Sequence, residues 1–414
     1  MQIKKNHLLL VICFFGYQIL SADASSLMQE TTQISFSVEQ STVTIDAEPD
    51  DEEKFVDVGR HRIFSKAEPL TLLTRTTGQF VRLSDGSIFS AMGVTCGISK
   101  DGGQTWTEYP MLDPEKFSMA GPVSVRTRKG TIIVGFSNWK ERTEFSMDKT
   151  TIVLNPTPKL PTYIVYSKDN GKTWSEPVKL HDDWTGANRR MLETKDGHIV
   201  FSTMIIRNNR ARHCVLTYVS SDDGATWKAS NVLDSPSSAG DHSGLMEADV
   251  IRLNDGRLWM LIRTNWDYFY ESYSSDNGLT WSAYQKTDID ASSSPGALIR
   301  LESGRIVLVW NRLYHKGKNE VRRLGGEALG DSGREIGEVP ASYQRDELSL
   351  MYSDDDGKTW SSPFVIAKNI TPAVRWWVDG ISYPHLFEPS KGVIWIITDQ
   401  GGLRIAIKEE DLPR

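Results

Sequence analysis

Two charged residues lie symmetrically about one predicted turn, in the stretch GLMEADVIRLNDGRLWMLIRTN. Glu247 precedes Asp255 by eight residues, and Arg263 follows it by eight. If Asp255 is in the turn, cross-strand pairing brings Glu247 and Arg263 to the same end of one hairpin. A carboxylate and a guanidinium inside so apolar a hairpin need partners. Arg263 can bind an acidic ligand through two parallel hydrogen bonds; a charge at a strand end on the surface is the alternative.

A tyrosine has the corresponding position in a second stretch, WWVDGISYPHLFEPSKG. Tyr383 lies nine residues before Gly392, and Glu247 lies nine residues before Gly256. The shared offset predicts that both residues begin the innermost strands of their sheets and face a common axis. The alternative for Tyr383 is a half-buried strand residue, which is the commoner role of tyrosine.

The same offset identifies one residue in each of four other predicted hairpins: Thr77, Gly121, Asn188 and Pro295. Asn188 is followed by Arg189 and Arg190, which we expect near the same axis. Just upstream of Tyr383, the indole rings of Trp376 and Trp377 offer a surface on which a sugar can stack, although most tryptophans of the chain serve turns and core.

A third arginine, Arg345, stands just before a predicted strand in QRDELSLMYSDDDGKTW. It follows residues 315–340, which are rich in glycine and charge and have no strand pattern. We expect that stretch to be a long loop near the site. Arg345 is then either a ligand-binding residue at the start of a strand or simply the end of the loop.

A repeated octapeptide with the pattern Ser-x-Asp-x-Gly-x-Thr-Trp predicts the turns between the strands that position these residues. Within it the aspartate accepts backbone N–H groups in a tight turn, and the glycine supplies a positive φ. The threonine bonds locally, and the tryptophan packs over the turn. We therefore predict a structural turn whose aspartates carry no chemistry. The five copies occupy residues 99–106, 167–174, 220–227, 274–281 and 353–360.

A second repeat consists of an apolar strand, a turn with glycine and another apolar strand, which is the signature of a β-hairpin. Five of its six copies are followed by the tryptophan turn, and repeats at this period indicate an array of supersecondary units. The fold class predicted is all-β: a six-bladed β-propeller of four-stranded antiparallel blades. We expect the C-terminal stretch GGLRIAIKEEDL and an N-terminal strand to complete the sixth blade and close the ring. The six copies occupy residues 80–93, 123–138, 191–204, 250–264, 297–311 and 385–399.

With these octapeptides, which look like Asp-boxes, the sequence resembles the sialidase (neuraminidase) superfamily over roughly residues 66 to 410. The Asp-box is specific for the fold, not for the activity. The resemblance implies a nucleophilic tyrosine activated by a glutamate, three arginines that bind the substrate carboxylate, and an aspartic acid that donates a proton. The matching positions are Tyr383 as nucleophile, Glu247 as its activator, and Arg263 and Arg345 as carboxylate ligands.

The sequence departs from that pattern in its first hairpin. The family's first arginine lies in an Arg-Ile-Pro-like motif, whereas here LTRTTGQFVRLSDG places Arg75 near that position without Ile-Pro. The family's proton donor precedes the first Asp-box, but the interval SIFSAMGVTCGISK contains no acid. Asp241 is our candidate for the proton donor, with Asp379 and His242 as alternatives.

The rest of the chain limits the class of protein. Of its 414 residues, 24% are charged, with a formal net charge of -7 and no basic block, so nucleic acid is not an expected partner. We divide the sequence into a signal peptide (residues 1–24), a leader with a possible ring-closing strand (25–65) and the propeller (66–414). A basic start, an apolar run and Ala22-Asp23-Ala24 indicate the signal, and so a secreted or periplasmic protein.

No later segment is long and apolar enough to span a membrane, and we expect a monomer. Of three cysteines, Cys13 leaves with the signal, so Cys96 and Cys214 are predicted to be buried free thiols. No cysteine and histidine cluster has the spacing of a metal site, and no cofactor is predicted.

Three functions fit this reading. The first is a secreted glycosidase of the sialidase type, which removes sialic acid or a related acidic sugar from glycans. The second is another carbohydrate-active propeller, such as a lyase on acidic polysaccharides, for which His242, His385 and Tyr383 are available as bases. The third is a propeller that binds glycans without catalysis.

Overall fold

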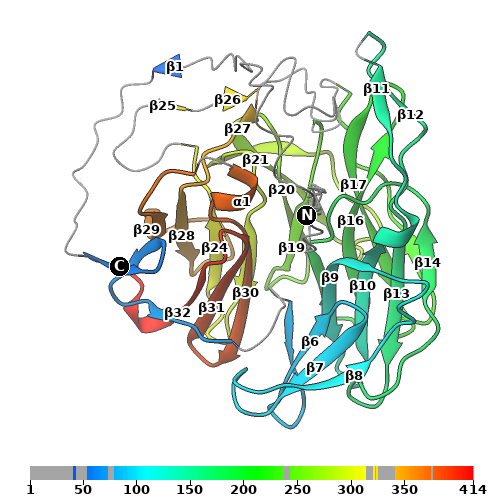
Figure 1. Cartoon of the computed structure of the whole chain (residues 1–414), viewed down its shortest axis with the longest axis horizontal. Coiled ribbons are helices and arrows are strands. Elements are labelled where there is room, and N and C mark those ends of the chain that lie inside the picture. The colour runs from blue at the N-terminus through cyan, green and yellow to red at the C-terminus, as the bar shows by residue number, and fades with distance from the viewer. Residues whose placement is uncertain are drawn as a thin grey trace, which may run out of the picture.

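The computed structural model describes residues 41–42, 54–72, 79–148, 150–236, 243–313, 320–321, 323–324, 341–373 and 376–413. In these ranges the chain is nearly all β, and six antiparallel sheets surround one axis as a six-bladed propeller (Figure 1). The predicted fold class is confirmed. The N-terminal residues 1–40 and 43–53, which include the predicted signal peptide and most of the leader, lie outside the described residues, as do Arg75, Asp241 and His242.

The first three blades follow one another directly along the chain. Blade one contains β5 (Phe80–Arg82), β6 (Ile88–Met92), β7 (Thr95–Ser99) and β8 (Thr107–Pro110). Blade two contains β9 (Met119–Arg126), β10 (Ile132–Asn138), β13 (Thr162–Ser167) and β14 (Val178–His181). Blade three contains β15 (Arg190–Glu193), β16 (Ile199–Arg207), β17 (Arg212–Ser220) and β18 (Lys228–Ala229).

The last three blades complete the circle. Blade four contains β19 (Ala248–Arg252), β20 (Leu258–Ile262), β21 (Tyr268–Ser274) and β22 (Gln285–Asp290). Blade five contains β23 (Ala297–Arg300), β24 (Ile306–Trp310), β28 (Glu347–Ser353) and β29 (Phe364–Asn369). Blade six contains β30 (Ser382–Ser390), β31 (Val393–Gln400), β32 (Arg404–Lys408) and β4 (Glu68–Pro69).

Blade six is thus closed by an N-terminal strand, because β4 pairs with β32 near the other end of the sequence. The hairpin of β2 (Phe55–Val58) and β3 (His61–Phe64) does not take part in this closure. It pairs with β29 instead and widens blade five to six strands. The result is that both ends of the described propeller chain are fastened to blades five and six.

Short strand pairs and helical turns lie outside the six blades. The paired strands are β11 (Ser146–Asp148) with β12 (Val153–Asn155), β1 (Ser41–Thr42) with β25 (Glu320–Val321), and β26 (Arg323–Leu324) with β27 (Ala341–Ser342). The helical turns are η2 (Trp139–Glu141), α1 (Trp376–Asp379) and η3 (Glu409–Asp411). No helix in the described residues is long and apolar enough to cross a membrane.

The hydrophobic core lies between the faces of neighbouring blades. The second strands β20 and β24 are buried at every position, because each has a blade on both sides. Between blades one and two, for example, Phe89 packs in one cluster with Phe136. Cys96 and Cys214 are buried and unpaired, as predicted.

The octapeptide turns have the predicted structure. In the second copy, Asp169 accepts the Thr173 backbone N–H (2.9 Å) and the Thr173 hydroxyl (2.6 Å). Gly171 has a φ of 86°, and its carbonyl accepts the Trp174 indole N–H at 3.1 Å. The fourth copy differs in one bond, since the indole of Trp281 donates to the Thr217 hydroxyl of blade three instead.

A partly buried ion pair connects the inner strands of three blades. Arg190 on β15 donates from Nε and Nη2 to the two carboxylate oxygens of Asp249 on β19, at 2.6 and 2.8 Å. Asp249 also accepts the Leu298 backbone N–H of β23 at 2.7 Å, and Arg190 donates to the Leu298 carbonyl. Because this group connects the inner strands of blades three, four and five, Arg190 has a structural role.

The Asp169 turn should make stability depend on pH. Hydrogen bonds from Thr173 hold the pKa of Asp169 at about 2, below its ordinary value of 3.8. Stability from this carboxylate is therefore complete above about pH 4 and is lost as the pH falls towards 2. We expect Asp169→Asn to lower the urea midpoint of unfolding at pH 6, and the difference from wild type to shrink between pH 4 and pH 2.

The matched control is Asp288→Asn, at an exposed position on β22. This substitution should leave the urea midpoint of unfolding unchanged at pH 6 and between pH 4 and pH 2. A constant difference between Asp169→Asn and wild type across the whole range would show that the turn does not depend on the aspartate charge.

Candidate functional site

Tyr383, Glu247 and Arg263 form a buried hydrogen-bonded cluster at the axis. The Tyr383 hydroxyl donates to Oε1 of Glu247 at 3.1 Å and accepts from Nη1 of Arg263 at 2.8 Å. The same Nη1 lies 3.0 and 2.9 Å from the two carboxylate oxygens of Glu247. The carboxylate and guanidinium of blade four and the phenol of blade six are therefore all hydrogen-bonded to one another.

The strand register explains why Glu247 and Arg263 meet. Ala248, the first residue of β19, pairs with Ile262, the last residue of β20. The flanking residues 247 and 263 therefore extend the same ladder. The Arg263 backbone N–H donates to the Glu247 carbonyl at 3.4 Å. Asp255 is in the turn at the other end, as the spacing predicted.

Residues before blade five hold the Arg263 side chain in place. Its Nε and Nη2 donate to the Ser293 hydroxyl at 3.2 and 3.0 Å, and Ser293 in turn donates to Asn265 at 2.6 Å. All three residues are buried. This bonding fixes the plane of the guanidinium and leaves Nη1 pointing at the Tyr383 and Glu247 pair.

Arg345 of blade five also lies near the Tyr383 ring. It precedes β28, is 1% exposed, and its guanidinium carbon is 5.4 Å from the ring centre of Tyr383. Nη1 donates to the Gln400 side-chain oxygen at 2.9 Å, and Nη2 donates to the Ser293 carbonyl at 2.6 Å. Both acceptors are neutral, so they leave the positive charge of Arg345 uncompensated by a carboxylate in these two contacts.

The backbone at Tyr383 is strained. Its φ is 59°, in the left-handed region that a bulky aromatic residue rarely adopts. Ser382 pairs with Gln400 and Pro384 pairs with Thr398, so Tyr383 lies within the ladder between β30 and β31. Such strain persists only where surrounding contacts hold it, and it is common where a side chain must be aimed.

Arg189 and His213 of blade three add positive charge near Glu247. Arg189 is 4% exposed, donates from Nη2 to the Pro384 carbonyl at 2.8 Å, and lies 5.8 Å from the Tyr383 ring centre. His213 is the second residue of β17, after Arg212, and its backbone bonds to Ser243 and Leu245 close to Glu247. The offset in the sequence indicated Arg189, whereas no pattern indicated His213.

The electrostatics favour a neutral phenol beside an ionised carboxylate. Burial raises the pKa of Glu247, but Arg263, His213 and Arg189 outweigh burial, so the pKa lies below its ordinary value. Burial raises the pKa of Tyr383, and Glu247 adds to this effect against Arg263 and Arg345. Burial and the nearby Arg263 lower the pKa of Arg345 to about 10. Glu247 is thus placed to accept the Tyr383 proton.

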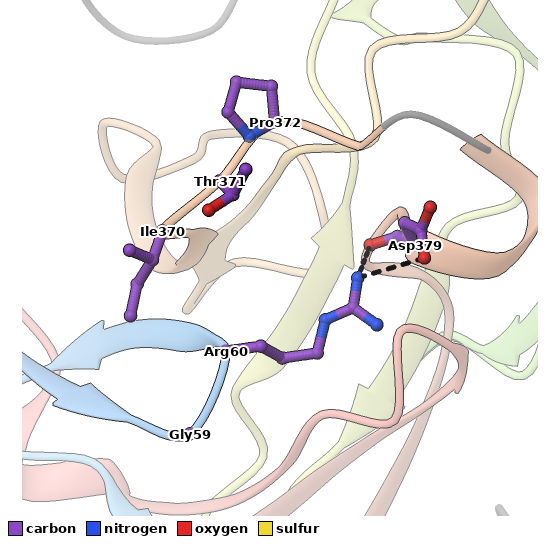
Figure 2. A pocket seen from close by; sticks show the side chains of 6 residues that line it. All are labelled: Gly59, Arg60, Ile370, Thr371, Pro372 and Asp379. Atoms are coloured by element: carbon purple, nitrogen blue, oxygen red, sulfur yellow. Dashed lines mark hydrogen bonds and ion pairs between the residues drawn. The ribbon is translucent and has the colours of Figure 1, made fainter.

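The other predicted residues lie elsewhere or outside the described residues. Arg75, Asp241 and His242 fall in the ranges that are not described. Asp379 lies beside Arg60, which donates to its carbonyl at 2.8 Å and lies 3.6 Å from its carboxylate, in the surface depression of Figure 2. That depression is also lined by Gly59, Ile370, Thr371 and Pro372.

Three further candidates lie in or just before blade six. His385 on β30 is paired with Asp399, Nε2 to Oδ2, at 2.9 Å. Trp376 and Trp377 form the first turn of α1. Among the described residues, no three histidine, cysteine, aspartate or glutamate side chains are grouped as a metal site would need.

Burial sets the physical conditions of the site. The four side chains of Tyr383, Arg345, Arg263 and Glu247 are at most 7% exposed. Charged hydrogen bonds are stronger in such surroundings than in water, and an unpaired charge is costly. With several guanidinium groups around one carboxylate, the described site has an excess of positive charge that suits an anionic ligand.

Comparisons with known proteins agree on one family. A family model described as BNR repeat-like domain matches residues 94–396. A sialidase of Paraclostridium sordellii is 27% identical over 238 residues, which cover 52% of this chain and 56% of that protein. A sialidase of Clostridium perfringens is 27% identical over 208 residues, which cover 45% and 51%. The chain thus spans about half the length of the curated relatives it matches.

Solved structures show the same fold. The NanB sialidase of Streptococcus pneumoniae superposes with a TM-score of 0.52 at 14% identity, over 84% of this chain and 70% of that chain. At such low identity the likeness concerns the fold alone.

The ion pair at the axis gives a prediction for stability. Glu247→Gln leaves Arg263 buried without its carboxylate partner, so we expect the free energy of unfolding to fall by about 3 kcal/mol in urea titrations at pH 7. The control is Glu302→Gln, which removes the partner of Arg82 in a pair whose side chains are 46% and 36% exposed. That change should cost under about 1 kcal/mol. Equal effects of the two substitutions would contradict the electrostatic account of the site.

Proposed function

The chain belongs to the BNR-repeat superfamily that includes sialidases, and from this premise we propose that it is a sialidase-like glycoside hydrolase. Its substrate is a glycan with a terminal sialic acid or a related acidic sugar. The observation that carries the proposal is the Tyr383 hydroxyl, which lies 3.1 Å from Glu247 and 2.8 Å from Arg263.

The substrate class follows from charge. An acidic sugar brings a carboxylate into a site that already contains Arg263 and Arg345, and arginines bind carboxylates through paired N–H groups. The same carboxylate would repel a negatively charged nucleophile. A neutral phenol that loses its proton only during attack avoids this repulsion, which suits Tyr383 better than an aspartate or glutamate.

In the proposed first step, Tyr383 Oη attacks the anomeric carbon while its proton passes to Glu247. The bond from that carbon to the leaving-group oxygen breaks, and a general acid protonates this oxygen; Asp241 is our candidate for that acid. Arg263 stabilises the charge that develops on the phenol oxygen through its 2.8 Å contact. Water then attacks the same carbon, and the bond from that carbon to the Tyr383 oxygen breaks and releases the sugar. Glu247 returns its proton to Tyr383, and the proton lost by the water goes to the ionised general acid.

A fluorogenic sialoside tests this function. Wild type should release the fluorophore, and Tyr383→Phe and Glu247→Gln should each lower kcat by about a thousandfold, because one removes the nucleophile and the other its base. The matched control is Tyr273→Phe, since Tyr273 also donates to a glutamate, Glu271, at 3.0 Å but in blade four away from the axis cluster. This control should keep wild-type turnover.

Other outcomes separate the competing functions. Products from acidic polysaccharides that absorb in the ultraviolet, without fluorophore release, would indicate a lyase. Binding of the sialoside with no turnover by wild type would indicate a glycan-binding propeller. Full turnover by Tyr383→Phe would contradict the proposed nucleophile.

The signal-peptide pattern of residues 1–24 supports the proposal that the protein acts in the periplasm or outside the cell. When the full chain is expressed in a secreting bacterial host, the exported protein should begin after Ala24, as read by N-terminal sequencing. Recovery only of intact chain from the cytoplasm would contradict export.

A further inference from the structure

Arg189 reaches across the ring to the residue next to Tyr383. It directly precedes β15 of blade three, and its Nη2 donates at 2.8 Å to the carbonyl of Pro384 in β30 of blade six. Blades three and six are opposite each other in a ring of six. The Arg189 side chain therefore reaches across the axis near the Tyr383 ring, whose centre is 5.8 Å from the guanidinium carbon.

The main chain of Arg189 is also anchored. Gln79, at the entry to blade one, donates from Nε2 to the Arg189 carbonyl at 2.6 Å. The side chain is 4% exposed, and its Nε has no hydrogen-bond partner among the described residues. Burying a cation in this way is costly, and the neighbouring Arg190 shows how the chain satisfies a structural arginine, with a bidentate carboxylate. Arg189 instead donates a hydrogen bond to a neutral backbone carbonyl, that of Pro384.

The Pro384 carbonyl lies next to the strained backbone of Tyr383. Tyr383 has the left-handed φ of 59°, and Pro384 follows it with a ring that fixes its own φ. The orientation of the phenol thus depends on a short rigid stretch of backbone. A hydrogen bond from a charged donor to the Pro384 carbonyl opposes the relaxation of that stretch to an ordinary conformation.

We propose that Arg189 is a positioning residue of the site, which braces the Tyr383–Pro384 backbone across the axis and keeps the phenol aimed at the reacting carbon. This inference rests on the proposed function for its catalytic consequence, whereas the brace itself is a property of the fold. It assigns a role to a residue of blade three, which supplies neither the tyrosine nor the glutamate.

The positive charge of Arg189 has a second effect on the same reaction. The groups that face Glu247 are Arg263 from blade four, His213 and Arg189 from blade three, and Tyr383 from blade six, with Arg345 of blade five beyond the phenol. Arg189 is among the groups that lower the pKa of Glu247. Removal of its charge raises that pKa, so the acidic limb of the kcat/KM profile moves to higher pH.

The test compares Arg189→Gln and Arg189→Lys with Arg190→Lys as the matched control, all in the full chain with a fluorogenic sialoside. Arg189→Gln should lower kcat by about tenfold to a hundredfold, since a small misplacement of a reacting group has effects of this size. Its KM should stay within about twofold, because the substrate contacts remain. Its acidic limb should shift to higher pH.

The two lysine variants separate charge from contact. Arg189→Lys keeps the positive charge, so its acidic limb should match wild type while kcat recovers only in part. Arg190→Lys should lower the unfolding midpoint and leave the pH profile unchanged. Wild-type kcat and pH profile in Arg189→Gln, or a loss that lies entirely in KM, would overturn the positioning role.

A measurement without substrate distinguishes failure of this inference from failure of the proposed function. In a crystal structure of Arg189→Gln, Tyr383 should leave the left-handed region, and the distance from its hydroxyl to Glu247 should exceed the 3.1 Å found here. An unchanged Tyr383 backbone would overturn the brace. If wild type turns over no sialoside but the Tyr383 backbone relaxes in the variant, the proposed function fails and the brace stands.

Discussion

The site depends on one constraint, that positive charge buried at the axis must be balanced where water cannot do it. Among the described residues, the negative charge of Glu247 balances this positive charge. Glu247 forms an ion pair with Arg263 and interacts with Arg189 and His213 through space. A carboxylate in this position stays ionised and can accept a proton from Tyr383. The remaining positive charge suits an acidic ligand, so the same constraint underlies the base, the nucleophile and the substrate class that we propose.

The scaffold separates this costly arrangement from the elements that stabilise the ring. The octapeptide turns satisfy their aspartates within a few residues, and the apolar faces of the blades pack against each other in hydrophobic clusters. Arg190 and Asp249 connect three inner strands just beside the site. A substitution at the axis therefore acts against a framework whose stability comes from elsewhere.

Much of this arrangement could be predicted because it follows from period and spacing. The repeats predicted the number of blades, and equal offsets from the turn glycines placed Glu247 and Tyr383 at the starts of the inner strands of their blades, next to the axis. What spacing cannot predict is which partner a side chain selects once it is at the axis. Arg189 and Arg190 are adjacent and identical, yet one binds a backbone carbonyl and the other a carboxylate. Ser293, Gln400 and His213 have no repeated position, so only the folded ring reveals that they lie beside the charged residues.

The two-residue strand β4 gives the ring a particular order of assembly. Its partner β32 follows the strands of the other five blades in the sequence, so blade six stays incomplete until all of those strands have been synthesised. Joining segments so distant in the chain carries a large loop-closure entropy and slows the final step of folding. Because Tyr383 is on the first strand of that same blade, the blade that closes the ring is also the one that contributes the phenol.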